Sequence, residues 1–215
     1  MIPDNDSTKN ALLLSALRIF ARKGYRGATV REICAGADSA NINSINYYFG
    51  SKEKLYRSIL EMLYSELGNK TAGNDVLNPV ERLKDYIKKS CEMLFAGGEI
   101  GAAFLAIYSH ELASPSSFSR ELSEKHSRPH YLEFYGLMKE LLGPGAGEGD
   151  IRRCMLSVGG QILYYHFMWQ EIKIVFPDHP DMGPYHAILA DHVIGFTLGG
   201  IDAIKKEISA RKKRG

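Results

Sequence analysis

The residues best suited to chemistry lie close together between positions 41 and 52. Four of them carry short amides or hydroxyls, which match the donors and acceptors on the edges of DNA bases. Three more carry tyrosine hydroxyls or an ammonium group, which suit phosphate oxygens. In chain order the seven residues are Asn41, Asn43, Ser44, Asn46, Tyr47, Tyr48 and Lys52. This spacing predicts a surface that contacts double-stranded DNA.

Two short helices would be needed to present these side chains. Thr29 and Glu32 have the spacing of a capping box, so one helix is expected over residues 29–37. The second is expected over residues 41–48, and Ile45 would fix it to the core. Together they make a helix-turn-helix, in which the second helix enters the major groove. The alternative is a polar surface helix with ordinary capping residues.

The start of the first of these helices supplies two further contacts. A helix N-terminus attracts anions, so the amides and hydroxyl of Thr29 are predicted to meet a phosphate, with Arg31 beside them. Residues 9–57 hold nine Lys or Arg and three acids, a difference of +6, whereas the whole chain carries only +2. A basic segment on a near-neutral chain favours an anionic partner such as nucleic acid. The alternative interpretation of these basic residues is a solvent-exposed face that binds no partner.

Two runs within this segment resemble the DNA-binding domain of the TetR family of bacterial transcriptional regulators. They are FARKGYRGATVREICAGA and INYYFGSKEKLY, and the resemblance covers residues 7–67. The asparagine before the tyrosine pair and the stretch FLAIYSHELASPS further resemble the CecR/YbiH-like subgroup. One departure is the turn Ala37-Asp38-Ser39-Ala40, which makes the segment from Ile33 to Ile45 one residue longer than usual; Asp38 tolerates a left-handed backbone better than most residues other than glycine. The longer turn affects the register in which residues 41–44 would contact the DNA bases.

The remainder of the chain reads as helical, with breaks rich in Gly and Pro. Helices are expected over residues 79–96, 99–113, 117–142, 150–176 and 184–209, and no strand pattern appears. Residues 68–78 predict a boundary between a DNA-binding domain at 7–67 and a helical domain at 75–215. The expected fold is therefore all-α. No apolar stretch reaches 18 residues and the first ten residues are polar, so we expect a cytoplasmic protein with no membrane contact.

The sequence offers no catalytic or metal-binding motif. Of its seven histidines only His126 and His130 have helical i,i+4 spacing, and Pro129 lies between them. The pair His110-Glu111 is too little to define a catalytic site. We therefore expect no enzyme activity, no cofactor and no metal. The alternative function is that of an all-α enzyme or adaptor whose N-terminal helices do not bind DNA.

The two last helices are unusually apolar and rich in glycine, which favours contact with a second subunit; the alternative is simple packing within one chain. The resemblance implies that they form a four-helix dimer interface, and that a small inducer binds in the helical domain of a homodimeric repressor. The residues expected in the interface are Ile162, Phe167, Ile194, Phe196, Leu198 and Gly199. Large apolar residues expected around a hydrophobic or aromatic inducer are Phe104, Tyr108, Phe134, Met138, Tyr165 and Trp169.

Overall fold

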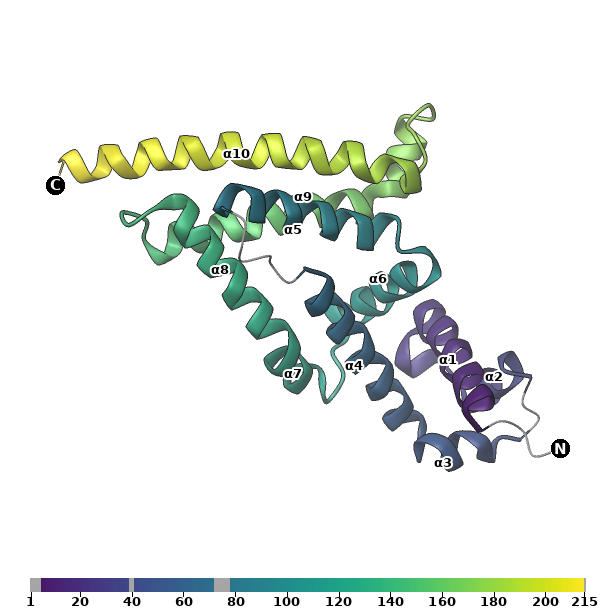
Figure 1. Ribbon diagram of the computed structural model, residues 1–215. Helices are drawn as coiled ribbons and strands as arrows, with labels where there is room; N and C mark the ends of the chain where they lie inside the picture. The colour runs from purple at the N-terminus through teal and green to yellow at the C-terminus, as the bar shows by residue number, and fades with distance from the viewer. Residues whose placement is uncertain (1–4, 39–40, 72–77, 215) are drawn as a thin grey trace. The chain divides into compact units, whose positions relative to one another are not determined.

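The structure is a computed structural model that describes residues 5–38, 41–71 and 78–214, and it confirms the all-α prediction (Figure 1). No strand occurs within those ranges. In chain order the elements are α1 (Asn5–Gly27), α2 (Val30–Gly36), α3 (Asn43–Phe49), α4 (Lys52–Thr71), α5 (Pro79–Phe95), α6 (Gly98–Ala113), α7 (Ser119–Leu122), a π-helical turn (Ser123–Ser127), α8 (Arg128–Leu142), α9 (Glu148–Val175) and α10 (Met182–Arg214).

The chain forms two compact units, and the first is made from two separate segments. Unit 1 comprises Met1–Leu67 and Glu99–His126, and unit 2 comprises Gly68–Gly98 and Ser127–Gly215. Residues 99–126, which the sequence assigns to the second domain, therefore pack with the N-terminal helices. The predicted boundary at 68–78 contains the last turn of α4, and its residues 72–77 lie outside the described ranges.

Unit 1 is built around one apolar face of α1. Leu12, Ala16, Leu17 and Phe20 follow helical spacing, and none is more than 2% exposed. Helical geometry breaks at Gly24, which has φ +66°, before a further turn ends at Gly27. A side chain there would also meet the His110 ring, because an added Cβ would lie 3.2 Å from its Nδ1 atom. Gly24 thus forms a kink within α1, and glycine is needed there for both reasons.

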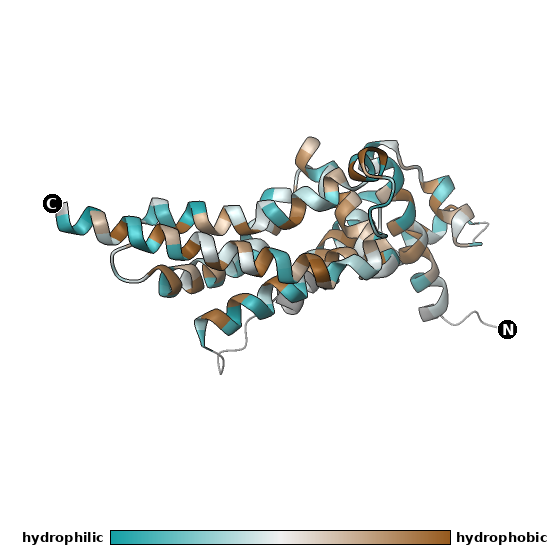
Figure 2. Ribbon diagram, turned by 90° about the horizontal axis from the view of Figure 1, so that it is seen from above, coloured by the Kyte–Doolittle hydropathy of each residue, from teal (hydrophilic) through white to brown (hydrophobic). Residues whose placement is uncertain are grey.

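Unit 2 is a bundle of α5, α8, α9 and α10 around an apolar core. Asn78 caps α5, since its side-chain oxygen accepts from the amides of Val80 and Glu81. Leu83, Ile87 and Val193 are fully buried in that core. Apolar residues recur along α10 between polar ones (Figure 2). The bundle is held mainly by burial of these apolar side chains.

The segment predicted as one helix over 117–142 contains three pieces. A short α7 passes into a π-helical turn, and α8 begins only at Arg128. Pro129 lies in the first turn of α8, where its missing N–H has no helical acceptor to lose. The proline thus marks a helix start.

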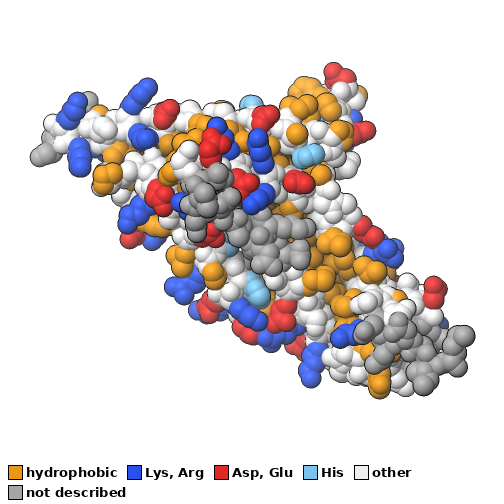
Figure 3. Space-filling model, viewed as in Figure 1, with side chains coloured by type: hydrophobic (Ala, Val, Ile, Leu, Met, Phe, Trp, Pro, Cys, Tyr) orange, Lys and Arg blue, Asp and Glu red, His pale blue; other side chains and the backbone are white. Residues whose placement is uncertain are grey.

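By length and composition alone, α10 could cross a membrane, because its stretch Met182–Lys213 is long and apolar enough. Core helices of soluble proteins satisfy the same criterion. One third of the apolar stretch is already buried inside the protein. Figure 3 shows Lys and Arg side chains gathered toward the C-terminal end of α10.

Candidate nucleic-acid interface

The start of α2 is fixed by the capping box that the sequence predicts. The Thr29 hydroxyl accepts from the Glu32 amide at 3.2 Å, and the Glu32 carboxylate accepts from the Thr29 amide at 3.2 Å. Lys23 forms an ion pair with Glu32 and, together with Thr29, lowers the pKa of that carboxyl to about 2. The Thr29 hydroxyl is thus already engaged within the protein, while the side chain of Arg31 is exposed.

Helix α3 has one buried anchor and an exposed polar face. Ile45 is fully buried, whereas Asn43, Asn46 and Tyr47 are exposed, Tyr47 by 76%. Ser44 and Tyr48 are half-buried, and the Tyr47 and Tyr48 rings meet edge to face at 4.9 Å. This is the orientation that a groove-reading helix requires: pinned on one side and able to form hydrogen bonds on the other.

The turn between α2 and α3 contains the expected left-handed residue. Asp38 has φ +50°, and Ser39 and Ala40 lie outside the described residues. Asn41 then forms an Asx turn just before α3, because its side-chain oxygen accepts from the Asn43 amide at 2.9 Å. The Asn41 amide group keeps its donors for a partner, but its oxygen is occupied.

Lys52 is held more tightly than its sequence position suggests. Its Nζ atom donates to the carbonyl oxygens of Tyr25 and Ala28, both at 2.9 Å, and lies 4.4 Å from the centre of the Tyr25 ring. An ammonium group has three N–H donors, so one remains for a phosphate. The contact with Tyr25 was missed because no local sequence pattern links positions 27 residues apart.

A second polar network, also missed, joins α4 to the end of α6. Glu111 is only 6% exposed and accepts from the Tyr56 hydroxyl at 2.8 Å and from the amide and hydroxyl of Ser116 at 3.0 and 2.8 Å. Burial, followed by the contact with Glu111, raises the pKa of Tyr56. His110 Nε2 lies 3.2 Å from the Ala21 carbonyl oxygen. The neighbours His110 and Glu111 thus bind different helices and do not act as a pair.

Comparison with known proteins identifies the architecture. Residues 79–201 match the C-terminal domain of the HTH-type transcriptional dual regulator CecR, and residues 12–59 match the tetR family of bacterial regulatory proteins. The repressor KstR2 of Mycobacterium tuberculosis (strain ATCC 25618 / H37Rv) is 35% identical over 211 residues, which is 91% of this chain and 94% of KstR2. The chain belongs to the TetR family.

Other relatives match over different lengths. The transcriptional repressor NicS of Pseudomonas putida is 34% identical over 84 residues, so the match spans 38% of this chain and only 39% of NicS. The crystal structure of AibR in complex with isovaleryl coenzyme A and operator DNA has a TM-score of 0.69. It covers 88% of this chain and 97% of AibR at 19% identity, which shows a shared fold.

The residues predicted to line an inducer site fall in both units of this TetR-family protein. Phe104 and Tyr108 lie in unit 1 with their rings stacked at 6.0 Å. In unit 2, Phe134 and Met138 are core residues, and Phe134 stacks on Tyr86 at 4.1 Å. The other two, Tyr165 and Trp169, lie on α9. The structure thus places these residues in separate packing environments.

Trp169 is buried in an aromatic cluster that sequence reasoning missed. Its ring centre lies 5.1 Å from that of His179 and 5.7 Å from that of Tyr185, while Tyr165 is half-buried nearby on α9. His166 Nδ1 and His179 Nε2 are both shielded from solvent without a hydrogen-bond partner. Burial lowers the pKa of His166. Within the described ranges no three His, Cys, Asp or Glu side chains gather as a metal site would.

The residues predicted for a dimer interface divide into inner and outer positions. Ile162 and Ile194 are 3% and 8% exposed and belong to the core of unit 2. Phe167 and Phe196 are 46% and 67% exposed, Gly199 is exposed, and Leu198 is half-buried. The sequence could not separate the two groups, because both helices are apolar on several sides.

Exposed apolar residues and glycines gather in one stripe on α9 and one on α10. On α9 the stripe contains Leu156, Tyr164, Phe167 and Ile174, and on α10 it contains Ile188, Gly195, Phe196 and Gly199. Most of their separations are three, seven or eight residues, about one or two helical turns, which keeps each stripe on one side of its helix. An added Cβ at Gly195 or Gly199 would meet nothing within 4 Å in the same subunit. These stripes are the outer apolar surface of α9 and α10.

Proposed function

We propose that the protein is a homodimeric repressor that binds a double-stranded DNA operator through α3 and releases it when an inducer binds. The observation that carries the proposal is α3 itself, anchored by buried Ile45 with Asn43, Asn46 and Tyr47 exposed, in a TetR-family head. KstR2 and NicS are named transcriptional repressors. We expect such a regulator to work in the cytoplasm without catalytic activity or a cofactor.

In this proposal the residues of the head divide into two roles. Asn43, Ser44 and Asn46 contact base edges, and the donors of Asn41 assist at the start of α3. Phosphates are bound by Tyr47, Tyr48, Arg31, the α2 N-terminus at Thr29 and the remaining N–H of Lys52. The phosphate contacts set the position of α3 and supply most of the salt dependence, while the short side chains supply sequence preference.

The outer stripes of α9 and α10 support the dimer. Single exposed apolar residues are common, but several large ones gathered on two neighbouring helices indicate a covered surface. The glycines of α10 allow a second helix to approach closely. Two subunits related by twofold symmetry would place their α3 helices in successive major grooves, about 34–36 Å apart or somewhat more.

The inducer in this proposal is a small hydrophobic or aromatic molecule bound in the helical body. Trp169, Tyr165, Phe134 and Met138 supply apolar and aromatic contacts within unit 2, whereas Phe104 and Tyr108 belong to unit 1 and are not part of this site. The AibR structure contains isovaleryl coenzyme A together with operator DNA. An inducer acts by binding better to the arrangement of subunits whose α3 spacing does not fit the operator.

The test is DNA binding by fluorescence anisotropy. Labelled fragments of the DNA upstream of the protein's own gene are titrated and compared with a shuffled sequence of equal length. We expect at least about a thousandfold preference for one fragment at moderate salt. The triple variant N43A/S44A/N46A should lose that preference and keep the weak binding to shuffled DNA. Equal affinity of the wild type for all fragments, specific and shuffled, would refute the proposal.

A further inference from the structure

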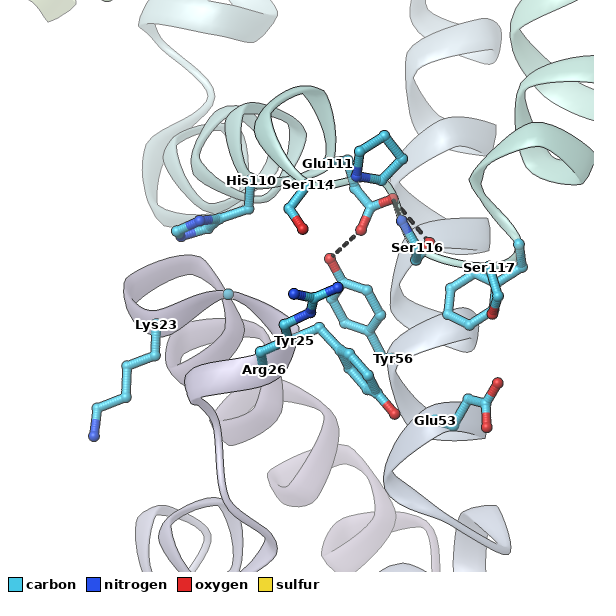
Figure 4. Close-up of a pocket in the computed structure, with 13 residues that line it drawn as sticks. Lys23, Tyr25, Arg26, Glu53, Tyr56, His110, Glu111, Ser114, Ser116 and Ser117 are labelled. Carbon is cyan, nitrogen blue, oxygen red and sulfur yellow. Dashed lines mark hydrogen bonds between the residues drawn. The ribbon is translucent and has the colours of Figure 1, made fainter.

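A cavity of about 240 Å³ lies within unit 1, between the end of α1, helix α4 and the segment that follows α6 (Figure 4). We propose that this cavity binds a small organic ammonium ion, with Glu111 as its anion. The site goes beyond the proposed inducer-controlled repression, because it lies in the DNA-binding unit and stands whether or not an inducer binds the helical body.

The first reason is the state of Glu111. Its carboxylate is 6% exposed and lines the cavity, but no ion pair joins it to a Lys or Arg among the residues that the structure describes. Buried charges are normally paired with an opposite charge. Three hydrogen bonds from Tyr56 and Ser116 occupy three of about four acceptor positions that a carboxylate offers. One acceptor position on Oε1 remains for an N–H donor.

The second reason is the aromatic wall of the cavity. Tyr25, Tyr56 and Phe118 all line it, with ring centres 5.0 Å apart for Tyr25–Tyr56 and 6.0 Å apart for Tyr56–Phe118. Aromatic faces attract cations and pack well against short alkyl chains. The Tyr25 ring already has the Lys52 ammonium group 4.4 Å from its centre. A buried carboxylate beside such rings selects a cation with an apolar body.

The third reason concerns the chain's own cations. Lys23 forms an ion pair with Glu32 and points away from the cavity, whereas the exposed side chain of Arg26 points toward Tyr56 (Figure 4). Glu53 adds a second carboxylate to the lining. Arg26 is therefore the one labelled cation in Figure 4 that would compete with an ammonium ligand, and its removal should favour the ligand.

Binding at this site would act directly on the DNA-binding head. Tyr25 contributes its ring to the cavity and its carbonyl oxygen to Lys52, and Tyr56 packs against both Tyr25 and Phe20. An ion against these rings would favour one arrangement of α1 and α4. The DNA-binding unit would thus respond to a small amine independently of the helical body.

The test uses propylammonium chloride as the probe and the deuterated, ¹⁵N-labelled full-length protein. The amide of Ser116 donates to Glu111, so its NMR signal reports on the carboxylate. We expect saturable shifts of Ser116 and neighbouring signals with a dissociation constant on the order of 1 mM. Equal concentrations of 1-propanol, sodium propionate or sodium chloride should give no saturable shift, because they lack either the ammonium group or the alkyl chain.

Three variants decide the assignment. Glu111→Gln should weaken propylammonium binding about tenfold or more, because the charged acceptor is lost. Arg26→Gln leaves the Glu111 network intact and should strengthen binding several-fold, which keeps the test decisive if Glu111→Gln does not fold. Glu92→Gln, an exposed carboxylate of α5, is the matched control and should bind as the wild type does. Equal shifts with 1-propanol, or no effect of either cavity variant, would overturn the proposal.

Discussion

The two units are held together in different ways. In unit 1, directional hydrogen bonds join elements far apart in the chain: Ser15 donates to the Ile33 carbonyl, Lys52 to the Tyr25 carbonyl and Tyr56 to Glu111. In unit 2 the contacts between helices are mostly apolar, and polar links such as Arg211–Asp150 and Arg82–Glu140 each join a largely buried side chain to an exposed one. Hydrogen bonds fix one geometry, whereas apolar packing tolerates rearrangement.

This contrast matches what each unit has to do. A helix that reads base edges must be held within a fraction of an ångström, and the buried polar links of unit 1 provide that rigidity. A body that changes state on binding a ligand needs packing with alternative arrangements of similar energy. Unit 1 exposes polar groups on α3, and unit 2 exposes apolar stripes on α9 and α10.

The largest expected effect on operator affinity comes from placing a charge in the exposed apolar stripe of α10 in unit 2. Phe196→Arg should leave the subunit folded, because Phe196 is 67% exposed within it, but should bury an unpaired charge between subunits. We expect a monomer in sedimentation and a loss of operator affinity of about a thousandfold or more. Gly199→Arg should behave alike, and Glu92→Arg on α5 is the control. A tightly binding wild-type monomer would contradict the dimer.

The next effect tests a polar link of unit 1. Lys52→Ala should weaken binding to every DNA sequence about tenfold, since it removes a phosphate donor and the contacts to Tyr25 and Ala28. The slope of log affinity against log salt should fall by about one ion per subunit. Reduced affinity with an unchanged slope would show that Lys52 acts only by positioning the α1–α2 connection.

A smaller effect is expected from the exposed face of α3. Asn43→Ala and Ser44→Ala should change base preference at one or two operator positions, each by about 1–3 kcal/mol, while leaving the salt slope unchanged. Selection from randomised operators measures this directly. Recovery of the wild-type consensus by both variants would assign readout to Asn46 instead, as a consequence of the longer turn before α3.

The smallest effect concerns the cap of α2 and its pH dependence. Lys23 and Thr29 lower the pKa of Glu32 from 4.5 to about 2. The negative charge of Glu32 therefore makes its full contribution to the stability of the folded state at any pH above the pKa that Glu32 has in the unfolded chain. Glu32→Gln should lower the urea midpoint at pH 7, and the difference should shrink as the pH falls from about 4.5 toward 2. A difference that stays constant over that range would show that the charge is not responsible.

The sequence could predict features that depend on neighbouring residues. The Thr29–Glu32 box, the left-handed Asp38 and the burial of Ile45 all follow from patterns a few residues long. The links from Lys52 to Tyr25 and from Tyr56 to Glu111 span 27 and 55 positions, and no periodic pattern encodes them. They depend on which helices meet, and that is decided by tertiary packing.

The same limit explains the mixed placement of the predicted interface residues. Ile162 and Phe167 lie on one apolar helix, and only the neighbours present decide that the first is core and the second is exposed. On α10, Phe196 follows the buried residues Leu189 and Val193 by seven and three positions, so helical spacing alone would place it beside them, yet it is 67% exposed. Helical periodicity gives the faces of such a helix, but it does not say which face has a partner.

The discontinuity of unit 1 has a consequence for engineering hybrid regulators. The chain leaves this unit after Leu67, returns at Glu99 and leaves again after His126. A chimaera joined once near residue 67 would take Tyr56 from one parent and the position of Glu111 from the other, so the buried hydroxyl would lose its acceptor unless both parents share it. Transplanting this DNA-binding head intact therefore requires three junctions, with residues 99–126 carried along as part of the graft.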